Sequence, residues 1–110
     1  MSVTTRAWVV LVVAGLVEIA WAVGLKYTAN WTRFWPSVTV LAAYVVDLVL
    51  LSYPMRHLPV GTAYSVWVGI GTVGVTAFGI AVFGESATPA RVFCLALILS
   101  GVVGLRLLEG

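Results

Sequence analysis

The chain has 110 residues, of which 62% are hydrophobic and 9% are charged, and its formal net charge is +2. A soluble domain has about a quarter of its residues charged, so this composition predicts an integral membrane protein. The small and dispersed net charge gives no reason to expect a nucleic-acid partner. The single cysteine, Cys94, excludes an intrachain disulfide.

Four apolar runs are long enough to cross a membrane as helices, since a bilayer core takes roughly 20 helical residues. Thr88 followed by Pro89 is typical of a helix N-terminus. The runs lack the alternation of a β-barrel, and the loops leave no room for a catalytic domain. We therefore predict an all-α polytopic membrane protein, with one four-helix domain over residues 1–110 and spans at about 7–26, 34–53, 58–83 and 90–108.

The first run has an alternative reading as a secretory signal peptide. Arg6 precedes it, and Ala20-Trp21-Ala22 resembles a cleavage site. Glu18 would interrupt the apolar part of such a signal, and three further spans follow it. We therefore expect a membrane helix here.

Basic residues near the span ends divide equally between the two sides of the membrane. One side has Arg6, Arg56 and Arg106, and the other has Lys26, Arg33 and Arg91. The positive-inside rule therefore assigns no orientation. Either the chain inserts both ways, which lets two copies pair as an antiparallel dimer, or one loop charge dominates and fixes one orientation. An antiparallel dimer would supply the two inverted halves that many secondary transporters have around a midplane site.

Glu18 is a lone carboxylate in the middle of the first run. The nearest base along the chain, Lys26, is eight residues away, or about 12 Å along a helix. An acid in hydrocarbon is costly and usually faces a cavity, titrates or binds a cation. Gly15 and Trp21 share the face of Glu18 at helical spacing. Trp21 is a candidate wall for a planar cation, or alternatively an anchor at the membrane interface.

Asp47 is a second acid, near the middle of the second run. It is as costly there as Glu18. Two buried acids per chain would make four in a dimer, and we expect closely placed acids to share protons.

The third run places Tyr64 and Trp67 one helical turn apart. Tyr64 can hydrogen-bond a carboxylate and Trp67 can form a wall of an aromatic site, and core packing is the alternative role for each residue. Gly69 and Gly71 weaken the helix, and we expect either a bend or close packing of small residues there.

The fourth run lacks a central acid or base. Its small residues Ser100, Gly101 and Gly104 predict a helix–helix contact, which we interpret as the dimer contact. No nucleophile–base pair or cluster of metal ligands stands out in the sequence. We therefore expect no enzyme activity, no cofactor and no metal.

Residues 15–27, 32–37, 58–71 and 83–86 together resemble the small multidrug resistance family, and the resemblance extends over nearly the whole chain. Trp21 three residues after Glu18, and Leu25-Lys26-Tyr27, are similar to the guanidinium-exporter subtype. The resemblance implies a multi-pass protein of a bacterial-type inner membrane. It also implies an antiparallel dimer that exports small cations in exchange for protons by alternating access.

The resemblance gives the central carboxylate role to Glu18 and the site walls to Trp21, Tyr64 and Trp67. It also implies a bend at Gly69 and Gly71 and a dimer contact at Gly101. The implied partners are a small organic cation, protons, lipid and a second copy of the chain.

Three positions depart from the family pattern. Asp47 stands where guanidinium exporters typically have a serine, Val68 where a threonine or serine is usual, and Ser65 where alanine is usual. The first departure replaces a neutral hydroxyl with an acid, which affects substrate and proton stoichiometry or indicates a heteromeric pair. Export of quaternary ammonium cations, and a partner chain inactive alone, remain the alternative functions.

Overall fold

The computed structural model describes residues 2–109 and consists of four long α-helices in that range. Their bounds are Val3–Gly24 (α1), Phe34–His57 (α2), Val60–Val82 (α3) and Pro89–Glu109 (α4), with a short 3₁₀ helix, η1, at Leu25–Thr28. All four are long and apolar enough to cross a membrane. The predicted all-α membrane fold is confirmed.

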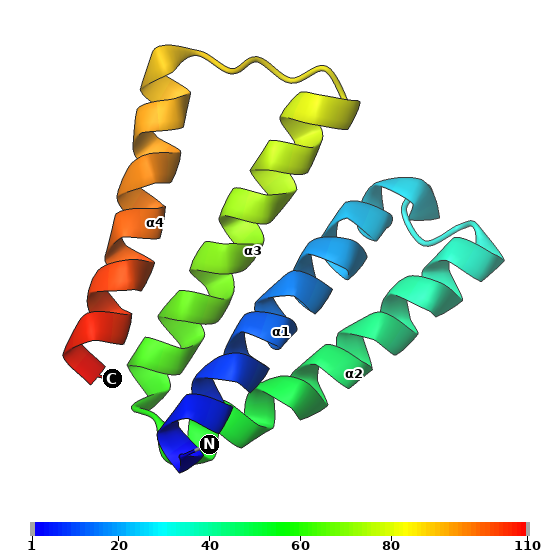
Figure 1. Ribbon diagram of the computed structural model, residues 1–110. Helices are drawn as coiled ribbons and strands as arrows, with labels where there is room; N and C mark the ends of the chain where they lie inside the picture. Colours follow the sequence, from blue (N-terminus) through cyan, green and yellow to red (C-terminus); the bar gives the residue numbers. More distant parts are fainter. Residues whose placement is uncertain (1, 110) are drawn as a thin grey trace.

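The helices run alternately up and down, and α1 lies between α2 and α3 (Figure 1). The outer helix α4 packs against α3. Its described side chains are all at least partly exposed, so α4 has an apolar face that the protomer itself does not cover.

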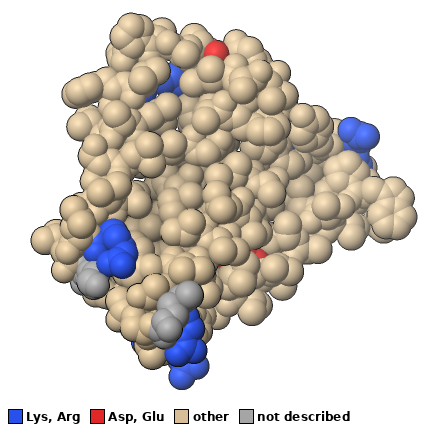
Figure 2. Space-filling view, viewed as in Figure 1, with Lys and Arg blue, Asp and Glu red and all other residues tan. Residues whose placement is uncertain are grey.

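Basic side chains gather at the two ends of the helices, with an uncharged surface between them (Figure 2). Such a distribution matches an apolar membrane core bounded by polar headgroups. Acidic atoms reach the surface in this view only as two small spots, one at the upper edge and one right of the centre (Figure 2).

Local signals account for the helix ends. Ser2 caps α1, since its hydroxyl accepts the backbone N–H of Thr5 at 3.1 Å. The fourth helix, α4, begins at Pro89, and the Thr88 hydroxyl accepts the N–H of Arg91 at 3.3 Å. The second helix extends beyond the predicted span, through Pro54 to His57. Pro54 removes only one backbone donor, and Leu58 N–H still bonds to the Pro54 carbonyl at 2.9 Å.

Glycines allow α1 and α3 to pack closely. A Cβ atom on Gly15 would lie 2.7 Å from Ile70 Cγ2 and 2.8 Å from Ile70 Cβ. The neighbouring core is formed by buried apolar side chains of three helices, among them Leu11, Leu51 and Val66. This contact sets the distance between the helices that carry the candidate site.

The substitution Gly15→Ala should destabilise the protomer, because the added methyl group meets the branched carbon of Ile70. Overpacking of this kind costs about 1–3 kcal/mol. Gly61→Ala is the control, since nothing lies within 4 Å of a Cβ there. Thermal unfolding in detergent should show a lower midpoint for Gly15→Ala than for Gly61→Ala. Equal midpoints would contradict the proposed packing constraint.

Candidate functional site

Asp47 is the centre of the candidate site. Its side chain is fully buried, with 0% of its surface exposed. Its Oδ2 atom accepts a hydrogen bond from Trp21 Nε1 at 2.7 Å and a second from Trp67 Nε1 at 3.3 Å. Three helices therefore converge on one carboxyl oxygen, with Asp47 on α2, Trp21 on α1 and Trp67 on α3.

Glu18 lies in the same region, half-buried on α1. Its carboxyl group lies against Gly71 of α3, where a Cβ atom would overlap it. Glycine at this position therefore lets the acid approach the backbone of α3. Trp21, which bonds Asp47, lies one helical turn after Glu18, so the two acids lie in the same part of the structure.

Each acid leaves one oxygen buried without a hydrogen-bond partner among the described residues: Glu18 Oε1 and Asp47 Oδ1. The described residues form one ion pair, at 2.7 Å, which joins Glu85 of the α3–α4 loop to Arg91 in the first turn of α4. Unpaired buried charge is costly in an apolar medium. The two acids therefore favour a proton or another cation in this region.

Of the three aromatic residues predicted for the site, Trp21 and Trp67 meet at Asp47, whereas Tyr64 does not. The Tyr64 and Trp67 rings pack with centroids 5.9 Å apart, and the Trp21 ring packs edge-on against Tyr44 at 5.0 Å. Tyr64 is 54% exposed, so it faces outward from the protomer. Its predicted bond to a carboxylate stays a prediction.

Tyr44 was missed by sequence reasoning. It lies three residues before Asp47, so helical spacing places it near the same face and could have identified it.

The predicted bend residues have packing roles in this structure. Gly71 makes room for Glu18, and a Cβ on Gly69 would lie 2.8 Å from Val102 of α4. The third helix is continuous from Val60 to Val82. A bend there stays a prediction about another conformation.

The predicted dimer-contact residues lie on α4, apart from the acids. Ser100 and Gly101 are exposed and Gly104 is half-buried. A Cβ on either glycine would meet nothing within 4 Å. Gly101 and Gly104 also line an open groove of about 410 Å³ between α3 and α4. This face has room for another helix.

Two larger grooves reach the protomer surface. One, of about 520 Å³, lies between α1 and α2 and is lined by Trp21, Tyr27 and Arg33 among others. It extends from the α1–α2 loop to Trp21, which bonds Asp47 in the candidate site.

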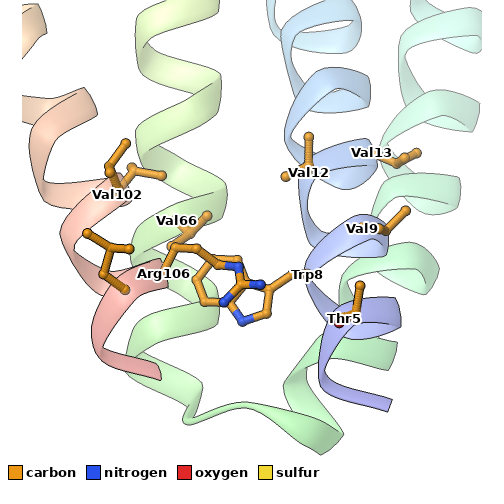
Figure 3. A pocket seen from close by; sticks show the side chains of 10 residues that line it. Thr5, Trp8, Val9, Val12, Val13, Val66, Val102 and Arg106 are labelled. Atoms are coloured by element: carbon orange, nitrogen blue, oxygen red, sulfur yellow. The ribbon is translucent and has the colours of Figure 1, made fainter. Parts of the chain in front are cut away.

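The other groove, of about 530 Å³, lies between α1 and α4 (Figure 3). Its lining is apolar except near Thr5, Trp8 and Arg106, and the Arg106 guanidinium lies 5.3 Å from the Trp8 ring centroid. Neither acid lines it, so it is separate from the candidate site.

Comparison with known proteins gives a consistent result. The model of the family described as "Small Multidrug Resistance protein" matches residues 6–98. A protein of Citrobacter freundii named "Guanidinium exporter" is 54% identical over 101 residues, which cover 92% of this chain and 96% of that protein. A Proteus vulgaris protein of the same name is 54% identical, with 92% and 97% covered. One from Salmonella typhimurium is 52% identical, with 92% and 96% covered.

Replacing Trp21 with Phe should destabilise the protein more than replacing Trp67 with Phe, because the Trp21 bond to Asp47 is shorter. A typical intramolecular hydrogen bond contributes about 0.5–1.5 kcal/mol. Trp35→Phe is the control, since Trp35 is 73% exposed. Chemical unfolding in detergent, followed by circular dichroism, measures the difference. The assignment fails if Trp21→Phe is as stable as Trp35→Phe.

Proposed function

Because the chain belongs to the small multidrug resistance family, we propose that it exports guanidinium or substituted guanidinium compounds in exchange for protons. It is a multi-pass protein of the bacterial inner membrane and an exporter of small cations. The observation that carries the choice of site is Glu18, a carboxylate inside a membrane span with a buried oxygen that has no partner among the described residues. The activity is transport rather than catalysis.

The exchange follows from competition for one carboxylate. Ionised Glu18 binds the cation, and protonated Glu18 releases it. Guanidinium is planar and presents paired N–H donors that match a carboxylate. The indole faces of Trp21 and Trp67 are suited to a flat cation, since aromatic faces attract cations by about 2 kcal/mol when water is excluded. Glu18 cannot bind a cation and a proton at the same time, so the cation flux is coupled to the proton flux.

The working unit is an antiparallel dimer. Equal numbers of basic residues on the two sides of the membrane support insertion in both orientations. The uncovered face of α4, with Ser100, Gly101 and Gly104, provides a contact for a second copy. The outward-facing Tyr64 is available to a site between two protomers.

Two alternatives are tested alongside guanidinium. Quaternary ammonium cations lack N–H donors but also bind to aromatic faces. Growth protection against guanidinium, without protection against benzalkonium-type cations, would support the proposal. The second alternative is a subunit that works only beside a different small chain. Transport by the purified chain alone excludes it.

The variant Glu18→Gln should lose guanidinium-driven current in proteoliposomes by about tenfold or more, because the charge that binds both the cation and the proton is gone. Solid-supported-membrane electrophysiology measures this current. Glu85→Gln is the matched control, since Glu85 lies in the loop and pairs with Arg91. Its current should equal that of the wild type. Wild-type currents in Glu18→Gln would refute the carboxylate mechanism.

The variant Gly101→Leu should weaken dimer formation, because a large side chain replaces a small one on the uncovered face of α4. Energy transfer between labelled chains in liposomes measures the association. Val103→Leu is the control on the same helix, at an already large and exposed position. Unchanged association in Gly101→Leu would place the dimer contact elsewhere.

A further inference from the structure

The two acids of the candidate site differ in what their oxygens contact. Both indole N–H groups donate to Asp47 Oδ2, whereas Asp47 Oδ1 and Glu18 Oε1 are buried without a partner among the described residues. The tryptophans therefore satisfy only the Oδ2 atom of Asp47. Asp47 Oδ1 and Glu18 Oε1 still need a proton or a positively charged partner.

No base reaches this pair from any helix packed around it in the described part of the chain. From η1, the Lys26 ammonium lies over the Phe83 ring at 4.0 Å. Arg33, which precedes α2, donates to the Tyr27 carbonyl at 3.4 Å. The titratable groups one helical turn from Asp47 on α2 and from Trp67 on α3 are the phenols Tyr44 and Tyr64, which supply no positive charge.

The charged groups farther along α2 and on α4 lie near the helix ends. Arg56 and His57 are exposed in the last turn of α2, and the Arg106 guanidinium lies over Trp8.

Trp21 lies one helical turn after Glu18, and Trp67 lies one turn before Gly71, which the Glu18 carboxyl group contacts. The two residues that bond Asp47 therefore also flank Glu18.

Two ionised carboxylates close together in an apolar region repel each other strongly, and the usual result is that the pair keeps one proton jointly. We propose that Glu18 and Asp47 form such a proton-sharing pair in each protomer, and that Asp47 keeps the proton while Glu18 binds the exported cation.

The burial of the two acids assigns their roles. Asp47 is 0% exposed and closed in by Trp21 and Trp67, so an exported cation has no route to it without a change in the fold. Glu18 is only half-buried and is the acid that a ligand can reach. A proton on Asp47 prevents a second negative charge from developing beside the ionised Glu18. Asp47 thus acts through Glu18 rather than on the cation.

This inference rests on the proposed function and deepens it. Asp47 stands where the family typically has a neutral serine, so the proton-sharing pair would be a property of this chain. It predicts that cation binding and proton binding compete over a different pH range here than in a chain without the second acid.

The most direct test is infrared spectroscopy of the purified protein saturated with guanidinium at neutral pH. The C=O stretch of a protonated carboxyl group should persist in the wild type and should be largely lost in Asp47→Asn. The asparagine keeps the shape and an oxygen that accepts the indole N–H groups, but it removes the acid. A cation-saturated wild type without this signal, or a signal unchanged in Asp47→Asn, would overturn the proposal.

A second measurement separates charge from positioning. The pH at which guanidinium binding is half lost, followed by tryptophan fluorescence, should be higher in Asp47→Asn than in the wild type by about one pH unit, because the shared proton that stabilises ionised Glu18 is gone. Asp47→Leu removes both the charge and the acceptor. If Asp47→Asn behaves as the wild type while Asp47→Leu does not, Asp47 only positions the tryptophans and the proton-sharing pair is wrong.

The failure of this inference can be told apart from failure of the proposed function. Guanidinium binding by Glu18→Gln at wild-type affinity would refute the function itself. Wild-type binding that depends on Glu18 but shows no retained proton would refute only the pair. Where Asp47→Asn does not fold, Asp47→Ser supplies the neutral side chain, and the wild-type infrared measurement decides alone.

Discussion

The arrangement depends on one electrostatic constraint, which is that a carboxylate inside the apolar part of a membrane needs a proton or a cation beside it. The described part of the chain provides no base to pair with Glu18 or Asp47, and its one ion pair joins the α3–α4 loop to the start of α4. The two carboxyl groups therefore lie within membrane spans without a basic side chain beside them in the described part of the chain. Exchange of a cation for a proton is the function that follows most directly from this arrangement.

The packing around the acids serves the same constraint. Gly71 lacks the side chain that would overlap Glu18, and Gly15 lets α1 approach α3. The two indole N–H groups that meet on Asp47 tie α1 and α3 to α2 through one oxygen. The glycines and tryptophans around the two acids therefore pack the helices together, and the same residues determine the geometry of the site. Trp21 and Trp67 act as packing residues and as candidate walls at once.

Much of this organisation can be predicted from the sequence. The four spans follow from the length of the apolar runs, the start of α4 from Thr88-Pro89, and the shared face of Glu18 and Trp21 from helical spacing. The contacts between helices do not follow in the same way. The bond from Trp21 to Asp47 depends on how α1 and α2 are rotated about their axes, which spacing within one helix does not specify. The place of Gly71 against Glu18 depends likewise on the depth at which α1 meets α3.

The central claim is that guanidinium and protons compete for the Glu18 carboxylate, and coupled flux tests it most directly. Proteoliposomes containing the purified wild-type chain would be loaded with a pH-sensitive dye and given an outward guanidinium gradient without a pH gradient. The account predicts that guanidinium leaving the vesicles drives protons inward, so that the interior becomes acidic. Guanidinium efflux at the same rate with no change in internal pH would contradict it.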